Sequence, residues 1–193
     1  WANNETGTLS DVPAIGALCR ERGVLFHTDA TQYVGKRPVD VNAANIDLLS
    51  ASAHKLYGPK GAGFLYVRRK GPRVRLDSQL DGGGQERGYR SGTLNVPGII
   101  GLAKALKLCT DELENESPRL ASLRDNLWQT LNEQIEGLQI CGPAIDIPEA
   151  SEHPRRLPGN LNFALGDVDG EALLMALDGL AISTGATCAS SDP

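Results

Sequence analysis

The chain has 193 residues, of which 40% are hydrophobic, enough for a substantial folded core. Lysine and arginine number 19 against 24 acidic residues, a net charge of −5, and no basic block is long enough to indicate nucleic-acid binding. No run of about 18 apolar residues occurs, so the sequence predicts no membrane span. The 4 cysteines form no C-x-x-C pair, which argues against a zinc site and a small disulfide scaffold and fits a reduced, cytosol-like compartment.

The first half of the chain predicts alternating helices and strands. A helix is expected to begin at Ser10-Asp11, where a capping oxygen precedes Pro13, and to end near Gly23. Buried strands are expected over 24–28 and 46–49, and a further strand over 63–67 after a glycine-rich turn. This order indicates an α/β layer arrangement.

From Pro97 the pattern becomes helical, with apolar residues recurring on one face as far as Ile135. We expect Pro118 to break or kink this helix, and we place a domain boundary near it. Residues 1–116 would belong to a large domain and residues 117–193 to a smaller one. Beyond the helix we expect a strand over 138–141, a proline-rich surface loop over 142–159 and a second strand over 160–164. A helix over 170–180 and a short strand over 181–183 should follow.

A lysine at a strand exit is the first candidate for chemistry. The segment 48–55 opens with apolar residues, turns polar at Ser52 and ends in His54 and Lys55, just before a Gly-Pro turn. An ammonium at the mouth of a buried strand is partly desolvated, which lowers its pKa and makes the amine a nucleophile toward an aldehyde. The alternative is an exposed lysine beside a structural histidine.

Other polar residues lie where a ligand could be bound. Asp29 follows the strand over 24–28, and ligands of open parallel sheets bind at the carboxyl ends of strands. A carboxylate there could keep a pyridine nitrogen protonated, or could simply cap a turn. Ser52, His54 and Thr93 offer hydrogen-bond donors for a phosphate, and His54 could equally be structural. Cys188 lies among small residues that cannot bury it, so it is either a nucleophilic thiol or an incidental exposed cysteine.

Five motifs follow one another along the chain: Asn3–Gly7, His27–Gln32, Ser52–Lys55, Gly82–Glu86 with Arg90–Thr93, and Thr184–Cys188. Together they closely resemble the pyridoxal-phosphate-dependent cysteine desulfurases of the class V aminotransferase group, over essentially the whole chain. The resemblance implies the α/β fold of PLP-dependent transferases (aminotransferase-like), with the C-terminal part of the large domain and part of the smaller domain. Because the chain starts without methionine and both ends look cut, we expect an internal fragment of a longer enzyme.

The resemblance implies roles for particular residues around pyridoxal 5′-phosphate. Lys55 would be the Schiff-base lysine, and Asp29 would be the partner of the pyridine nitrogen. Gln32 and Asn4 would form hydrogen bonds near the cofactor's phenolic oxygen and the substrate.

The remaining roles concern the phosphate and the sulfur. Ser52 and His54 would hold the cofactor's phosphate, and Thr93 would reach the phosphate of the cofactor in the other subunit of a homodimer. Cys188 would be the nucleophile that takes sulfur as a persulfide. No metal is implied.

The implied activity is removal of sulfur from L-cysteine, which yields L-alanine and a persulfide on Cys188. The sulfur would pass to an iron–sulfur scaffold or another sulfur-acceptor protein, for cluster assembly or tRNA thiolation, without direct contact with nucleic acid or membrane. The expected location is the cytoplasm, or the mitochondrial matrix in a eukaryote. The alternatives are a selenocysteine lyase, another class V PLP enzyme, or an inactive fragment that only binds partners.

Overall fold

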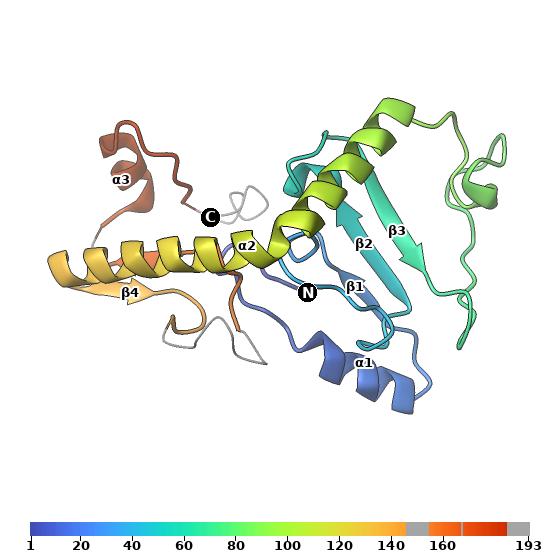
Figure 1. Cartoon of the computed structure of the whole chain (residues 1–193), viewed down its shortest axis with the longest axis horizontal. Helices are drawn as coiled ribbons and strands as arrows, with labels where there is room; N and C mark the ends of the chain where they lie inside the picture. Colours follow the sequence, from blue (N-terminus) through green and yellow to red (C-terminus); the bar gives the residue numbers. More distant parts are fainter. Residues whose placement is uncertain (146–154, 167, 185–193) are drawn as a thin grey trace. The chain divides into compact units, whose positions relative to one another are not determined.

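The structure is a computed structural model that describes residues 1–145, 155–166 and 168–184 (Figure 1). It divides into two compact units, each with its own sheet. The first unit consists of Trp1 and Asp11–Leu113, and the second of Ala2–Ser10 and Glu114–Pro193. The domain boundary that the sequence places near residue 116 stays a prediction. Within the described ranges, no helix has the length and apolar character needed to cross a membrane.

The sheet of the first unit has the strand order β1-β2-β3. Strand β1 (His27–Asp29) runs parallel to β2 (Leu48–Ser52), and β3 (Gly63–Val67) runs antiparallel to β2 (Figure 1). The predicted bounds of β3 are confirmed, whereas β2 begins and ends later than the expected 46–49. Buried and half-buried residues alternate along β2, because it is the central strand and its two faces alternate with every residue.

The expectation of a buried strand over 24–28 is wrong in part. Strand pairing begins only at His27, and the side chains of Val24 and Leu25 are 57% and 51% exposed. The physical reason is the position of β1 at the edge of the described sheet, where β2 is its only paired neighbour. Apolar side chains predict burial only when a neighbouring element covers them.

Helix α1 (Val12–Glu21) starts where the sequence predicts. The side chain of Asp11 accepts a hydrogen bond of 3.1 Å from the backbone N–H of Ala14, which satisfies one free donor of the first turn. Gly16 is buried, and a Cβ atom built on it would lie 2.0 Å from the carbonyl oxygen of Ala44. The missing side chain therefore allows the helix to approach the loop that leads into β2.

Helix α2 (Val96–Gln134) is a single element that continues through Pro118, so a break there is wrong, while a kink stays a prediction. A proline inside a helix removes one backbone hydrogen bond and costs about 3 kcal/mol. Side chains on both sides of it are buried, among them Leu102 and Ala105 before the proline and Ala121 after it. The helix thus continues through Pro118 with buried side chains before and after it.

The second unit contains a small antiparallel sheet of β4 (Leu138–Ile140) and β5 (Phe163–Leu165), in which Ile140 pairs with Phe163. These strands were expected over 138–141 and 160–164, so their existence is confirmed and their bounds shift by a few residues. Residues 146–154 of the expected surface loop lie outside the described residues.

Helix α3 (Gly170–Ala176) is capped by Asp169, whose side chain accepts a backbone hydrogen bond in the first turn. The expected helix over 170–180 is therefore too long, and Gly179, with φ of 79°, adopts a left-handed conformation that does not continue it. The short strand expected over 181–183 is also wrong, because no described strand pairs with these residues.

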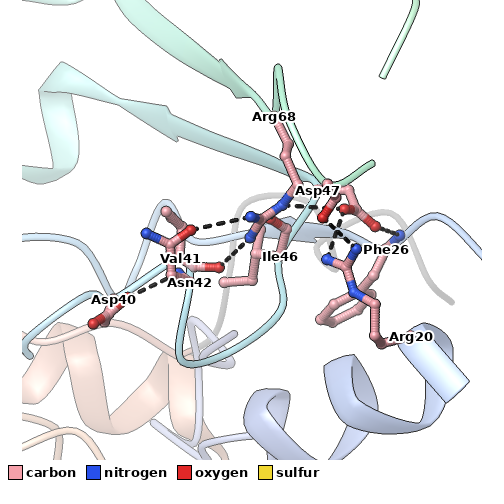
Figure 2. A network of polar contacts seen from close by, with 9 residues as sticks. Arg20, Phe26, Asp40, Val41, Asn42, Ile46, Asp47 and Arg68 are labelled. Carbon is pink, nitrogen blue, oxygen red and sulfur yellow. Dashed lines mark hydrogen bonds and ion pairs between the residues drawn. The ribbon is translucent and has the colours of Figure 1, made fainter. Parts of the chain in front are cut away.

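A buried polar network lies at the entrance of β2 (Figure 2). The carboxylate of Asp47, 3% exposed, lies 3.2 Å from a guanidinium nitrogen of Arg20 and 3.2 Å from one of Arg68. It also accepts a hydrogen bond of 3.0 Å from the backbone N–H of Phe26, just before β1. Arg68 in turn donates to the backbone carbonyl of Ile46 and to two acceptors in the preceding loop. The network ties the starts of β1 and β2 together.

The hydrophobic core of the first unit surrounds β2 and the turn that follows it. Its members come from β2 itself, from α1, from the loops before and after the strands, and from α2. They are Val12, Ala30, Val34, Ala44, Ile46, Leu49, Ala51, Leu56 and Ala105.

Candidate functional site

The carboxyl ends of β1 and β2 meet at one edge of the sheet. The strands run parallel with Asp29 opposite Ser50, and the backbone N–H of Ala30 continues the ladder by donating to the carbonyl of Ser50 over 2.9 Å. Asp29 and the segment Ser52–Lys55 therefore lie at the same edge, as the parallel arrangement requires. This edge is the candidate site.

Asp29 presents an ionised carboxylate at this edge. Burial alone would raise the pKa of Asp29, but hydrogen bonds from the side chain and the backbone of Thr31, together with the positive charges of the terminal amine of Trp1 and of His27, lower that pKa below its usual value. The backbone N–H of Thr31 lies 2.8 Å from Oδ1 of Asp29. Because Thr28 and Ala30 on either side are buried, the strand end holds the exposed Asp29 in place.

Ser52 and His54 form a polar pair at the end of β2. The Oγ atom of Ser52 and the Nδ1 atom of His54 share a hydrogen bond of 2.6 Å, and His54 is exposed. Ala53 between them is fully buried, and its backbone N–H donates to the carbonyl of Ala62 over 2.9 Å. The buried backbone of Ala53 thus holds the hydroxyl group of Ser52 and the imidazole of His54 at the surface, where they can donate hydrogen bonds to an anion.

Lys55 ends a short 3₁₀ turn, η1 (Ala53–Lys55), and its side chain is exposed. The expected partial desolvation of Lys55 is therefore wrong in this structure. The turn takes Lys55 out of the line of the strand and buries its neighbours instead, since Ala53 is 0% and Leu56 is 1% exposed. The amine is accessible at the same edge as Asp29.

The turn after Lys55 is held by the N-terminal part of α2. A Cβ atom built on Gly58 would lie 3.1 Å from Cβ of Ala105, and one built on Gly101 would lie 2.8 Å from Cγ of Pro59. These glycines allow helix and turn to approach closely. The backbone after Lys55 is therefore fixed although the lysine side chain is exposed.

Sequence reasoning missed Lys36, which lies in the turn after β1. Its Nζ atom donates a hydrogen bond of 2.8 Å to Oε1 of Gln32. Burial lowers the pKa of Lys36, and the positive charge of Lys55 lowers it further, while Cys109 acts in the opposite direction. The spacing of four residues between Gln32 and Lys36 was the only sequence signal for this contact.

Thr93 is not joined to this edge by the structure. Thr93 is exposed in the loop before α2 and forms no hydrogen bond with Asp29, Ser52 or His54 within the described residues. Cys188 lies outside the described residues. In the described part of the chain, no group of three or more His, Cys, Asp or Glu side chains could hold a metal ion.

Asn4 belongs to the second unit and is exposed in a turn. That turn is fixed by a segment distant in sequence. Asn160 donates from Nδ2 to the carbonyl of Glu5 over 2.8 Å, and Arg156 donates from Nη1 to the carbonyl of Thr6 over 2.7 Å. Sequence reasoning assigned neither residue a role, because nothing in the local pattern indicates a partner about 150 positions away.

Replacing Arg156 should destabilise the protein. Arg156 is 4% exposed and donates to backbone carbonyls of Thr6, Cys141 and Pro143 as well as to the side chain of Asn160. The substitution Arg156→Met leaves these acceptors without their donor, so we expect a loss of about 3 kcal/mol in the free energy of unfolding. Urea denaturation of the full chain measures it.

The neighbouring exposed Arg155 provides the matched control. Arg155→Met should change the free energy of unfolding by less than about 0.5 kcal/mol. Equal midpoints and slopes for the two variants would show that Arg156 does not hold the turn.

Known proteins resemble the chain in sequence and in fold. The sequence model of the aminotransferase class-V family matches residues 1–192. Cysteine desulfurase IscS of Anaeromyxobacter dehalogenans is 52% identical over 98% of the chain and 44% of its own length, and IscS of Neisseria meningitidis (strain Z2491) gives the same three values. The chain thus spans less than half the length of these curated relatives.

Solved structures show the same fold. A NifS-like protein from Rickettsia africae superposes with a TM-score of 0.79 at 30% identity, over 92% of this chain and 46% of that one. DndA from Streptomyces lividans superposes with a TM-score of 0.72 at 35% identity, over 90% of this chain and 46% of its own.

Proposed function

The chain belongs to the class V aminotransferase family and has the α/β fold of its PLP-dependent transferases, and on that premise we propose that the protein is a cysteine desulfurase. The enzyme would remove sulfur from L-cysteine, release L-alanine and pass the sulfur to an acceptor protein. The observation that supports this best is the sheet edge where the parallel register of β1 and β2 places an ionised Asp29 beside the Ser52–Lys55 segment.

The residues of this edge fit pyridoxal 5′-phosphate, which enzymes of this family generally use. Asp29 offers a carboxylate that stays ionised and can pair with a protonated pyridine nitrogen. Ser52 and His54 offer neighbouring donors for a phosphate, and Lys55 offers an accessible amine. When bound, the cofactor supplies an electron sink for the substrate's α-carbon.

The chain's own groups would handle the protons and the sulfur. The Lys55 amine would hold the coenzyme and would serve as the group that moves the α-proton of L-cysteine. Asn4 and Gln32 would form hydrogen bonds near the cofactor's phenolic oxygen and the substrate. The Cys188 thiolate then attacks the substrate sulfur.

The sulfur step balances without an external oxidant. The Cβ–S bond of L-cysteine breaks, an S–S bond to Cys188 forms, and protonation of the carbon skeleton yields L-alanine. A thiol of the acceptor protein can then take the outer sulfur of the persulfide, which restores the free thiol of Cys188. In this scheme the Cys188 thiol must reach the substrate first and the acceptor afterwards.

The proposal extends to partners and location. The enzyme would act as a homodimer in which Thr93 reaches the phosphate of the cofactor in the other subunit. The acceptor would be an iron–sulfur scaffold or another sulfur-carrying protein. We place the enzyme in the cytoplasm, or in the mitochondrial matrix of a eukaryote, since the free thiols of Cys19, Cys109 and Cys141 fit a reducing compartment.

Sulfur transfer through Cys188 can be tested directly in the full chain. With L-cysteine and cofactor, mass spectrometry of the wild-type protein should show one added sulfur atom on the peptide that carries Cys188. Cys188→Ser should still bind the cofactor but lose this adduct and alanine release, because no thiolate attacks the sulfur.

Cys19→Ser is the matched control, since Cys19 lies on α1 and is only half-buried. This variant should keep both signals. Undiminished sulfur transfer by Cys188→Ser would refute the role of Cys188, and turnover of another amino acid with none of L-cysteine would refute the substrate.

A further inference from the structure

The carboxamide of Gln32 is held by Lys36. An ammonium group has three N–H donors and no acceptor, so only the oxygen of a carboxamide can face it. The 2.8 Å contact between Nζ of Lys36 and Oε1 of Gln32 therefore fixes which end of the carboxamide points toward the lysine. The –NH₂ end of Gln32 is turned the other way and is kept as a donor.

The turn that carries Lys36 is seated against the segment that follows Lys55. Gly35 has φ of 76°, and a Cβ atom on it would lie 2.6 Å from Cδ2 of Leu56 and 3.0 Å from Cβ of Cys109. Only glycine permits this approach, so the backbone before Lys36 is fixed against the residue after Lys55. The backbone position of Lys36 is therefore set by the packing of this turn.

The electrostatic surroundings indicate that Lys36 is close to the reactive amine. The pKa of Lys36 is lowered first by burial and then by the positive charge of Lys55. Among the described residues no carboxylate forms an ion pair with Lys36, and the other titratable group that faces it is Cys109.

We propose that Lys36 is a positioning residue that locks the carboxamide of Gln32 so that its –NH₂ group donates to the phenolic oxygen of the cofactor. This inference rests on the proposed function, because it takes Gln32 as a neighbour of that oxygen. Without Lys36, the carboxamide of Gln32 can rotate and present its oxygen to the phenolic oxygen. Two acceptors would then face each other with no hydrogen between them. Above the pKa of Lys36 the neutral amine can accept as well as donate, so the lock weakens as Lys36 loses its proton.

The first test uses the cofactor-free full chain with ¹⁵N-labelled glutamine side chains. The Gln32 amide resonance, assigned by its loss in Gln32→Leu, should be displaced from those of exposed glutamines and should move with pH as Lys36 deprotonates. In Lys36→Met the Gln32 resonance should move to the chemical shift of exposed glutamines and become independent of pH. In Lys36→Arg it should keep its displaced chemical shift. Lys104→Met, at an exposed position on α2, is the control and should change nothing.

The second test is a double-mutant cycle with L-cysteine as substrate. Lys36→Met should lower kcat/KM by roughly tenfold, the effect of losing one hydrogen bond to a charged group, and Lys36→Arg should recover most of it. In the Gln32→Leu background, Lys36→Met should not lower kcat/KM any further, because the carboxamide is already absent. A purely structural role would cost the same in both backgrounds.

The outcomes separate this inference from the proposed function. An unchanged Gln32 resonance in Lys36→Met, or an equal loss of kcat/KM in both backgrounds, would overturn the role of Lys36. The predicted amide response in a protein that releases no alanine from L-cysteine would overturn the proposed function alone.

Discussion

Replacing Lys55 by alanine should abolish turnover of L-cysteine and the covalent capture of pyridoxal phosphate. Lys55 is accessible at the end of η1, at the same sheet edge as the ionised Asp29. Loss of a positioned proton-transfer group alone costs about 10²–10⁴-fold in rate, and loss of the attachment point adds to it. Alanine release by the full chain and the cofactor's absorbance after gel filtration measure the two effects.

The matched control is Lys60→Ala, which removes an exposed lysine from the glycine-rich turn that follows. Its absorbance and alanine release should equal those of the wild type. If Lys55→Ala keeps the cofactor's absorbance and a turnover within tenfold of the wild type, the amine has another source and the assignment of Lys55 fails.

Replacing Asp47 by asparagine should cost about 3 kcal/mol of the free energy of unfolding. The carboxylate is 3% exposed and lies 3.2 Å from both Arg20 and Arg68, so the variant leaves two cations without their counter-charge. Breaking a buried ion pair by removing one partner typically costs about 3–5 kcal/mol. We expect the lower figure, because the side chain of Arg20 is 33% exposed and can be hydrated.

Urea denaturation of the full chain measures this loss, with Asp77→Asn at an exposed position as the control. The Asp47 network ties the starts of β1 and β2, so amide hydrogen exchange along β2 should also accelerate in Asp47→Asn. A free energy of unfolding within 1 kcal/mol of the wild type would show that the network does not hold the strands.

Local patterns in the sequence predicted those features that depend on neighbouring residues. The start of α1 follows from the capping carboxylate of Asp11, and the bounds of β3 follow from an apolar run between glycine-rich turns. Asp29 and Lys55 were placed at strand ends by the same reasoning, and the parallel register puts both at one edge. The family resemblance rested on motifs of this local kind.

Features that depend on distant partners could not be predicted. The exposure of Val24 follows from the edge position of β1, and the exposure of Lys55 from the 3₁₀ turn that carries it. Pro118 indicated a break or a kink, yet α2 continues through it with buried side chains on both sides. The contacts of Arg156 join residues far apart in sequence, so no window of the sequence reveals them.

The contact between Lys36 and Gln32 is an intermediate case. Its four-residue spacing is visible in the sequence, but many such pairs exist along any chain. Only the folded turn shows that the ammonium faces the carboxamide and is close enough to Lys55 for their charges to interact.

Borohydride trapping on the full chain tests the central claim most directly. The protein is incubated with pyridoxal 5′-phosphate, reduced with borohydride and digested, and the peptides are sequenced by mass spectrometry. We expect a stable adduct on Lys55, with Lys36 and Lys60 unmodified. No adduct, or an adduct on a lysine other than Lys55, would contradict it.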